Sequence, residues 1–182
     1  RDLHSFPTRR SSDLHSPMMS VALGTLYVPL TYFAGWSTNF PFLDIYLTGT
    51  YYFPILMVGY LIRKKGSALL SAFIIFLIQV PFTPWGILMI YFAVLLGLPI
   101  EIMFLIKKYS NLKLWYLMLI GGIVGILGSI NRYFVIGLGV VSLPLIIYYF
   151  VVSFIAGSIW GGALAKFLSD KILQTCVLSK RG

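Results

Sequence analysis

The stretch Leu69–Ile106 constrains the fold more than any other part of the sequence. It consists of two apolar runs separated by the short segment Pro81–Gly86. Each run has about the length that crosses a bilayer as a helix, and lipid offers no water to pair with exposed backbone groups. Basic residues bracket the two runs, with Arg63-Lys64-Lys65 before them and Lys107-Lys108 after them. The stretch therefore predicts a transmembrane helical hairpin whose two open ends lie on the same side of the membrane.

The composition extends this prediction to the rest of the chain. Of the 182 residues, 59% are hydrophobic and 10% are charged, and a water-soluble domain of this size cannot bury so many apolar side chains. We therefore expect an all-α integral membrane protein, a bundle of six transmembrane helices that forms one domain over residues 17–178. The expected spans cover residues 18–35, 45–62, 68–81, 87–106, 114–130 and 140–165.

The two ends of the chain are expected to lie outside this domain. Residues 1–16 are polar, repeat the tetrapeptide Asp-Leu-His-Ser and resemble translated sequencing-adapter read-through, so we expect them to be disordered. Residues 179–182 are expected to form a short basic tail. Both histidines lie within residues 1–16 and Cys176 is the single cysteine. The sequence therefore predicts no metal site, no cofactor and no intramolecular disulfide.

The distribution of basic residues predicts the orientation of the six spans. The linkers after the second and fourth spans and the segment after the sixth hold ten cations, whereas the other three linkers hold only Arg132. Cytoplasmic loops of membrane proteins carry the excess of Lys and Arg, so both termini are expected to be cytoplasmic. The net charge of +9 is therefore no sign of a nucleic-acid partner, and we expect a multi-pass protein of the plasma membrane in contact with lipid.

Small residues recur at every fourth position in the last two spans. The fifth span carries Gly121, Gly125 and Ser129, and the sixth carries a similar series from Ser153 through Gly157 and Gly161 to Ala165. This spacing predicts a close approach of neighbouring helix backbones. In the first span, Ser20 and Gly24 have the same spacing. They indicate either ordinary helix packing or a surface on which a partner docks.

No catalytic constellation is present, so we expect no enzyme activity. Polar residues in and beside the spans are the better functional candidates, because placing them in lipid costs free energy. Rings and amides at the outer ends of the spans, with one loop carboxylate, predict a pocket for a flat polar ligand. Each ring alone is more typical of an interfacial aromatic belt than of a ligand site. The predicted pocket residues are Asp44, Tyr51, Gln79, Trp85, Tyr91 and Asn131.

Glu101 is expected to have a different role. It lies only six residues before Lys107, and therefore about 9 Å from the cytoplasmic end of its helix. That depth is too far from the outer side for a pocket residue. The sequence predicts an internal structural partner for Glu101, with contact to a coupling partner as the alternative.

Three stretches together resemble the YkoE family. Leu61-Ile62-Arg63-Lys64-Lys65-Gly66-Ser67-Ala68-Leu69-Leu70 is similar to its Arg-Lys-Pro-Gly-Ala-Ala-Leu segment, and Gly97-Leu98-Pro99-Ile100-Glu101-Ile102-Met103-Phe104 to its Gly-Leu-Gly-Ala-Glu-x-x-Phe segment. The sequence from Ile155 to Leu178 is similar to the last helix and tail of the family. Gln79 departs from the pattern, because the family often has Glu there.

The resemblance implies a function. Members of the family are substrate-binding (S) components of energy-coupling-factor (ECF) vitamin importers of the ABC type. It implies capture of thiamine or its hydroxymethylpyrimidine precursor, with a transmembrane coupling subunit and two cytoplasmic ATPases as partners. The alternatives are an S component for another small molecule, including the older cobalt-permease label, and an intramembrane lipid-handling protein.

Overall fold

In the computed structural model, the chain is described at residues 17–29, 32, 45–83, 85–110, 112–135 and 142–179, and these parts are helical with short turns. A first helix covers residues 17–29. The helices that follow it are η1 (Thr48–Tyr51), α3 (Phe53–Ile62), α4 (Ser67–Gln79), η2 (Val80–Phe82), α5 (Leu88–Ile106), α6 (Leu114–Val135), α7 (Leu143–Ala156), the π-helical η4 (Gly157–Ala163) and α8 (Leu164–Ser179).

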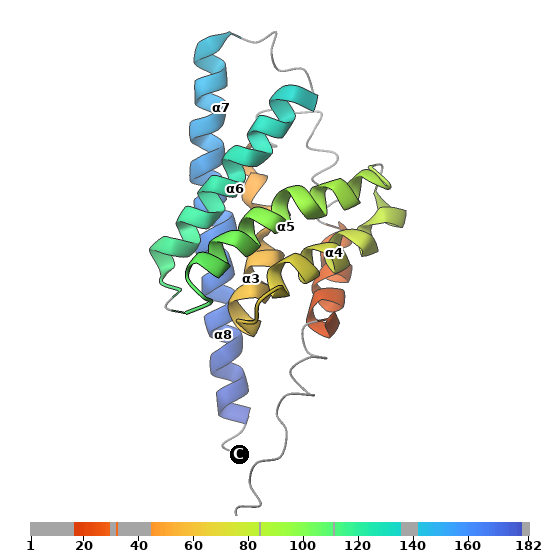
Figure 1. The fold of residues 1–182 in the computed structure, drawn as a ribbon, viewed down its shortest axis with the longest axis vertical. Helices are drawn as coiled ribbons and strands as arrows, with labels where there is room; N and C mark the ends of the chain where they lie inside the picture. Colours follow the sequence, from red (N-terminus) through yellow and green to blue (C-terminus); the bar gives the residue numbers. More distant parts are fainter. Residues whose placement is uncertain are drawn as a thin grey trace, which may run out of the picture.

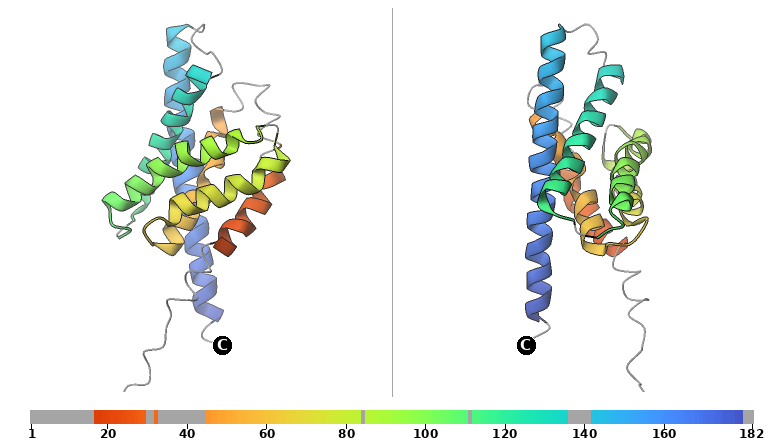
Figure 2. Two further views of the ribbon diagram at one scale, coloured as in Figure 1. Left: turned by 45° about the vertical axis from the view of Figure 1, so that its right-hand side comes forward. Right: turned by 60° about the vertical axis from the view of Figure 1, so that its left-hand side comes forward.

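Helix α3 lies at the centre of the bundle. Every side chain from Pro54 to Tyr60 is buried, and α3 contacts α4, α5, η4 and α8. In the right-hand view of Figure 2, the long helix formed by α7, η4 and α8 stands on one side of the molecule and the α4–α5 pair on the other. The core therefore consists of α3 and the faces of the helices that pack around it.

The α4–α5 hairpin agrees closely with the sequence prediction. Helix α4 ends at Gln79 and α5 begins at Leu88, with η2 and the turn at Trp85 between them. Gly86 lies in this turn with a φ of 48°, a left-handed conformation that glycine adopts without the steric cost of a side chain. The two helices lie side by side (Figure 1). The Pro and Gly residues of the turn thus end one helix and start the next where the sequence places them.

Small residues bring α6 and η4 into backbone contact, which confirms the prediction made from their spacing. A Cβ atom on Gly121 would lie 2.3 Å from the carbonyl oxygen of Gly157, and one on Gly162 would lie 2.4 Å from that of Leu117. Nearer the C-terminal end of α6, the Ser129 hydroxyl donates a hydrogen bond of 2.6 Å to the Ser153 hydroxyl. A larger side chain at either glycine would force the two helices apart.

Tyr52 fills the junction of α3, α6 and η4. Its side chain is 1% exposed, and its hydroxyl donates to the carbonyl oxygen of Gly121 at 2.6 Å. A Cβ atom on Gly161 would lie 2.5 Å from Cε2 of this ring. The glycines therefore make room for an aromatic ring as well as for a neighbouring backbone.

Three predicted spans differ from the observed helices. Residues 45–62 do not form one helix, because η1 ends at Tyr51 and α3 restarts at Phe53 with Pro54, which has no N–H to continue a helix, in its first turn. Helix α6 continues past residue 130 to Val135, since no Gly or Pro interrupts residues 131–135. The sixth helix continues past residue 165 to Ser179 (Figure 1).

Three helices in the described part of the chain are long and apolar enough to cross a membrane, namely Leu88–Ile106, Leu114–Phe134 and Leu143–Gln174. Two shorter apolar helices, Phe53–Ile62 and Ser67–Phe82, accompany them. The six-span bundle and the cytoplasmic position of both termini remain predictions. Residues 1–16 and 180–182 lie outside the described residues.

Candidate functional site

Three aromatic rings, those of Trp85, Tyr91 and Phe92, lie together where the α4–α5 turn enters α5. We call them the ring group. The ring of Phe92 meets the Trp85 ring edge to face, with centroids 6.2 Å apart, and the Tyr91 ring at 5.6 Å. The Tyr91 hydroxyl donates a hydrogen bond of 2.8 Å to Oδ1 of Asn131 in the last turns of α6. Three of the predicted pocket residues, Trp85, Tyr91 and Asn131, are therefore brought together by one ring group and one hydrogen bond.

Arg132 joins the same end of α6 to two further elements. Its guanidinium carbon lies 5.5 Å from the centroid of the Tyr51 ring in η1, within the range of cation–π attraction. Its Nη1 donates to the Tyr149 hydroxyl in α7 at 3.5 Å. Tyr51, a fourth predicted residue, thus lies against the residue that follows Asn131. From the sequence, Arg132 was interpreted only as an orientation signal, although a lone cation among aromatic residues could have marked it as a site residue.

The other two predicted pocket residues are placed differently. Gln79 is the last residue of α4 and is 1% exposed. It lies in the chain just before the turn that carries Trp85, at the same end of the hairpin, and a buried amide requires hydrogen-bond partners. Asp44 lies outside the described residues. A pocket that includes all six predicted residues therefore remains a prediction.

Ser20 and Gly24 face the interior of the protein. Both are buried, and a Cβ atom on Gly24 would lie 3.3 Å from Cα of Ile75 in α4. In this structure, the small residues of the first helix are used for packing against α4. Docking of a partner at Ser20 and Gly24 remains a prediction.

At the opposite end of the hairpin, the Glu101 carboxylate binds the start of α4. It accepts hydrogen bonds from the backbone amides of Gly66 at 2.7 Å, Ala68 at 3.1 Å and Leu69 at 3.3 Å. A carboxylate at a helix N-terminus pairs amides that have no partner within the helix and lies favourably in the helix dipole. Glu101 thus binds the backbone amides of three residues that lie more than thirty positions before it in the sequence.

Tyr109 completes the surroundings of Glu101. Its hydroxyl donates to Oε2 of Glu101 at 2.6 Å, and its ring stacks on Phe104 with centroids 5.2 Å apart. Burial, together with the hydrogen bond to Glu101, raises the pKa of the Tyr109 hydroxyl above its ordinary value of 10. The hydroxyl therefore stays protonated at physiological pH and remains a hydrogen-bond donor to the carboxylate.

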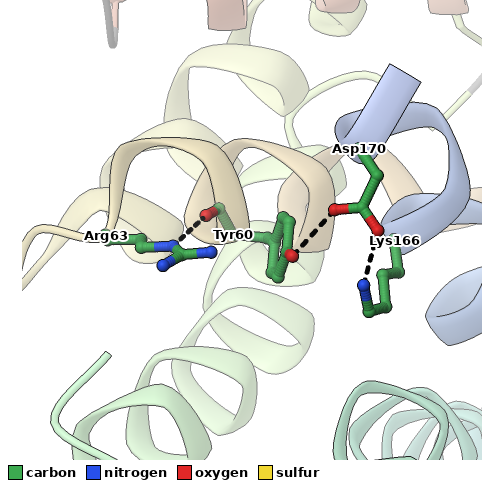
Figure 3. A network of polar contacts seen from close by, with 4 residues as sticks. All are labelled: Tyr60, Arg63, Lys166 and Asp170. Atoms are coloured by element: carbon green, nitrogen blue, oxygen red, sulfur yellow. Dashed lines mark hydrogen bonds and ion pairs between the residues drawn. The ribbon is translucent and has the colours of Figure 1, made fainter. Parts of the chain in front are cut away.

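A second polar cluster links α3 to α8 (Figure 3). The Tyr60 hydroxyl donates to Oδ1 of Asp170 at 2.8 Å, and Lys166 forms an ion pair with the other oxygen of Asp170. The guanidinium carbon of Arg63 lies 5.0 Å from the centroid of the Tyr60 ring. From the sequence, Lys166 was interpreted only as one of the cations that follow the sixth span. The four-residue spacing of Lys166 and Asp170 was the available signal for a helix that continues beyond residue 165.

Within the described ranges, no group of three His, Cys, Asp or Glu side chains is placed to hold a metal ion. The polar groups that the predicted pocket residues and Arg132 bring to the Trp85 end of the hairpin are amides, phenols and a guanidinium. These groups stack on and hydrogen-bond to organic molecules, whereas transition metals prefer imidazole and thiolate ligands.

The arrangement of the helices is that of a known class of membrane protein. The structure matches the "Crystal structure of an S-component of ECF transporter" with a TM-score of 0.84 at 26% sequence identity, covering 97% of this chain and 90% of that one. With its long apolar helices, the protein is therefore a multi-pass membrane protein with the fold of an ECF transporter S component.

The chain belongs to the family described as "ABC-type cobalt transport system, permease component", whose match covers residues 14–127. It is also 29% identical over 167 residues to a Bacillus subtilis (strain 168) protein named "Putative HMP/thiamine permease protein YkoE", covering 89% of this chain and 83% of that protein. The resemblance to the YkoE family that the sequence predicted is thus confirmed, and the proteins it matches are transport components.

Proposed function

We propose that this S component captures thiamine or its hydroxymethylpyrimidine precursor from outside the cell and delivers it to an ECF importer. The observation that carries the proposal is the hydrogen-bonded pair of Tyr91 and Asn131 beside the Trp85 and Phe92 rings. Rings of this kind can stack on a pyrimidine, and amides can pair with its ring nitrogens and amino group. The name of the Bacillus subtilis relative supports the same ligands.

The ring group and the Glu101 cap lie near opposite ends of α5. Tyr91 and Glu101 are ten residues apart on this helix, which corresponds to about 15 Å along its axis. The basic residues gather beyond the Glu101 end, so the positive-inside rule supports an outer position for the rings. Ligand capture at the rings would thus leave the Glu101 end free for events on the cytoplasmic side.

The proposed partners are a transmembrane coupling subunit and two cytoplasmic ATPases. Ligand binding would close the outer loops, with Asp44 in the loop that covers the ligand and Gln79 at the base of the pocket. ATP hydrolysis by the partners would then reorient the S component through the coupling subunit. Docking at Ser20 and Gly24 would require these residues to separate from α4, on which they pack in the structure.

Cobalt is the second candidate substrate, because the family description names it. A vitamin requires stacking rings and hydrogen-bonding groups, whereas cobalt requires metal ligands such as imidazole or thiolate. Isothermal titration calorimetry of the purified chain with thiamine, hydroxymethylpyrimidine and cobalt chloride, each titrated separately, distinguishes them. The vitamin proposal predicts saturable heat from at least one of the two organic ligands. Heat from cobalt alone would reject it.

A matched pair of variants tests whether the rings form the binding site. Tyr91→Phe removes the hydroxyl that holds Asn131, whereas Tyr46→Phe removes a hydrogen bond of 2.7 Å to Tyr148. Both tyrosines are 48% exposed. One hydrogen bond contributes about 0.5–1.5 kcal/mol, so Tyr91→Phe should weaken ligand binding about two- to tenfold. The affinity of Tyr46→Phe should equal that of the wild type, and an equal loss in both variants would contradict the proposed site.

A further inference from the structure

The two basic turns of the protein are joined by one carboxylate. We define the basic turns as Arg63–Gly66, between α3 and α4, and Lys107–Ser110, at the end of α5. The amide of Gly66 and the hydroxyl of Tyr109 bind the two different oxygens of Glu101. The turns therefore lie next to each other in space, although forty residues separate them in the sequence.

The backbone of both basic turns is fixed in an uncommon conformation. Arg63, Lys108 and Tyr109 have φ values of 53°, 48° and 55°, in the left-handed region that costs energy for residues with side chains. Such conformations persist where the surrounding contacts hold them. Here the backbone amide of Arg63 donates a hydrogen bond to the carbonyl oxygen of Gly59. The Nε of Arg63 donates a hydrogen bond to the carbonyl oxygen of Tyr60 (Figure 3). The backbone of the two basic turns, from which the lysine side chains extend, is thus held in place.

Exposed apolar residues lie close to these cations along α4 and α5. Lys65 and Lys108 are exposed and directly precede Gly66 and Tyr109, the two donors to Glu101. On the membrane side of the turns, Leu70 is 48%, Ile102 47% and Ile106 66% exposed. Ile102 and Ile106 are one helical turn apart and therefore share a face of α5. Exposed cations on a fixed backbone, at the end of an exposed apolar helix face, match the headgroup and the acyl chains of an anionic phospholipid.

We propose that the basic turns bind the headgroup of an anionic phospholipid, whose acyl chains lie along Leu70, Ile102 and Ile106. Lys65 and Lys108 contact the headgroup phosphate, and Glu101 is a positioning residue that holds the two turns in register. Basic pockets between transmembrane helices at the headgroup level attract anionic lipids. A free phosphate ion or an acidic protein surface would make no use of the adjoining apolar residues.

Native mass spectrometry of the full chain in detergent, with equimolar phosphatidylglycerol and phosphatidylcholine, tests the proposal. The wild type should retain phosphatidylglycerol in preference to phosphatidylcholine. Each lysine near an anionic lipid contributes about fivefold in affinity, so Lys65→Gln with Lys108→Gln should lower phosphatidylglycerol binding roughly 25-fold. Phosphatidylcholine binding should not change. The matched control removes two other exposed cations by Lys113→Gln with Lys171→Gln, and should leave both lipids as in the wild type.

Three results would overturn the proposal. Equal binding of the two lipids to the wild type would show that charge does not select the lipid. An equal loss in the control double variant would assign the effect to net charge and not to the basic turns. Displacement of phosphatidylglycerol by millimolar inorganic phosphate would show a site for a free anion. Because Lys65 and Lys108 are exposed, both double variants should unfold at the wild-type temperature, and this is measured alongside.

Discussion

Replacing Glu101 by Gln tests the physical account of the contact between α5 and the start of α4. The side chain keeps its size, so the substitution leaves no cavity. It changes only the charge and one oxygen of a group that is 6% exposed and accepts four hydrogen bonds. A glutamine has a single acceptor oxygen. When that oxygen takes the three donors at Oε2, its amide nitrogen faces the amide of Gly66 donor to donor.

The expected change in the free energy of unfolding follows from the contacts that Glu101→Gln removes. A hydrogen bond to a charged group contributes about 1.5–3 kcal/mol, and the favourable position of a carboxylate at a helix N-terminus adds about 0.5–1 kcal/mol. Glu101→Gln should therefore lower the free energy of unfolding by about 2–4 kcal/mol. For a chain of this length, 1 kcal/mol corresponds to about 2–4 °C in Tm, so we expect Tm to fall by roughly 4–16 °C.

Thermal unfolding in detergent, followed by intrinsic fluorescence, measures this shift. Asp170→Asn is the matched control, because Asp170 also binds a tyrosine hydroxyl but its side chain is 39% exposed. Exposed ion pairs contribute about 0–1 kcal/mol, so the control should lose at most about 4 °C. A shift for Glu101→Gln no larger than that for Asp170→Asn would refute the reasoning.

Two further substitutions test the packing of α6. Gly121→Ala should lower the free energy of unfolding by about 1–3 kcal/mol or more, because its Cβ would meet the Gly157 carbonyl oxygen at 2.3 Å. A Cβ atom on Gly128, in the same helix, would meet nothing within 4 Å. Gly128→Ala should therefore raise the free energy of unfolding by up to about 1 kcal/mol. Equal shifts of Tm in the two variants would contradict the close approach of α6 and η4. Tyr52→Phe removes the buried hydrogen bond to Gly121 and should cost about 1 kcal/mol, whereas an unchanged Tm would show that this bond contributes nothing.

The hairpin and the α6–η4 contact were predictable because local signals mark them. Pro and Gly in the turn end α4 and start α5, and the four-residue spacing of Gly121 and Gly125 indicates a close helix contact before any partner is known. These features depend on residues close together in the sequence, which is where sequence patterns give most information. The interruption of the second span before Phe53 was not predicted, although Pro54 was visible.

Contacts between distant residues were harder to predict. Glu101 was expected to have an internal partner, but no spacing rule identifies the start of α4 as that partner, because the carboxylate binds amides that every residue carries. Arg132 was placed in a loop because the expected span ended at residue 130. The structure instead places it on α6, facing Tyr51 and Tyr149. Both contacts depend on which helices lie side by side, and this cannot be read from a single sequence.

The central claim of this account is that the ring group faces the outside of the cell and the basic turns face the cytoplasm. Cysteine labelling of intact cells with a membrane-impermeant maleimide tests it most directly. Ile87→Cys and Lys107→Cys are introduced separately after replacing Cys176 by Ser; Ile87 is 77% exposed and lies two residues after Trp85. The account predicts labelling at position 87 in intact cells, and at position 107 only after permeabilisation. Labelling of both positions in intact cells would contradict it.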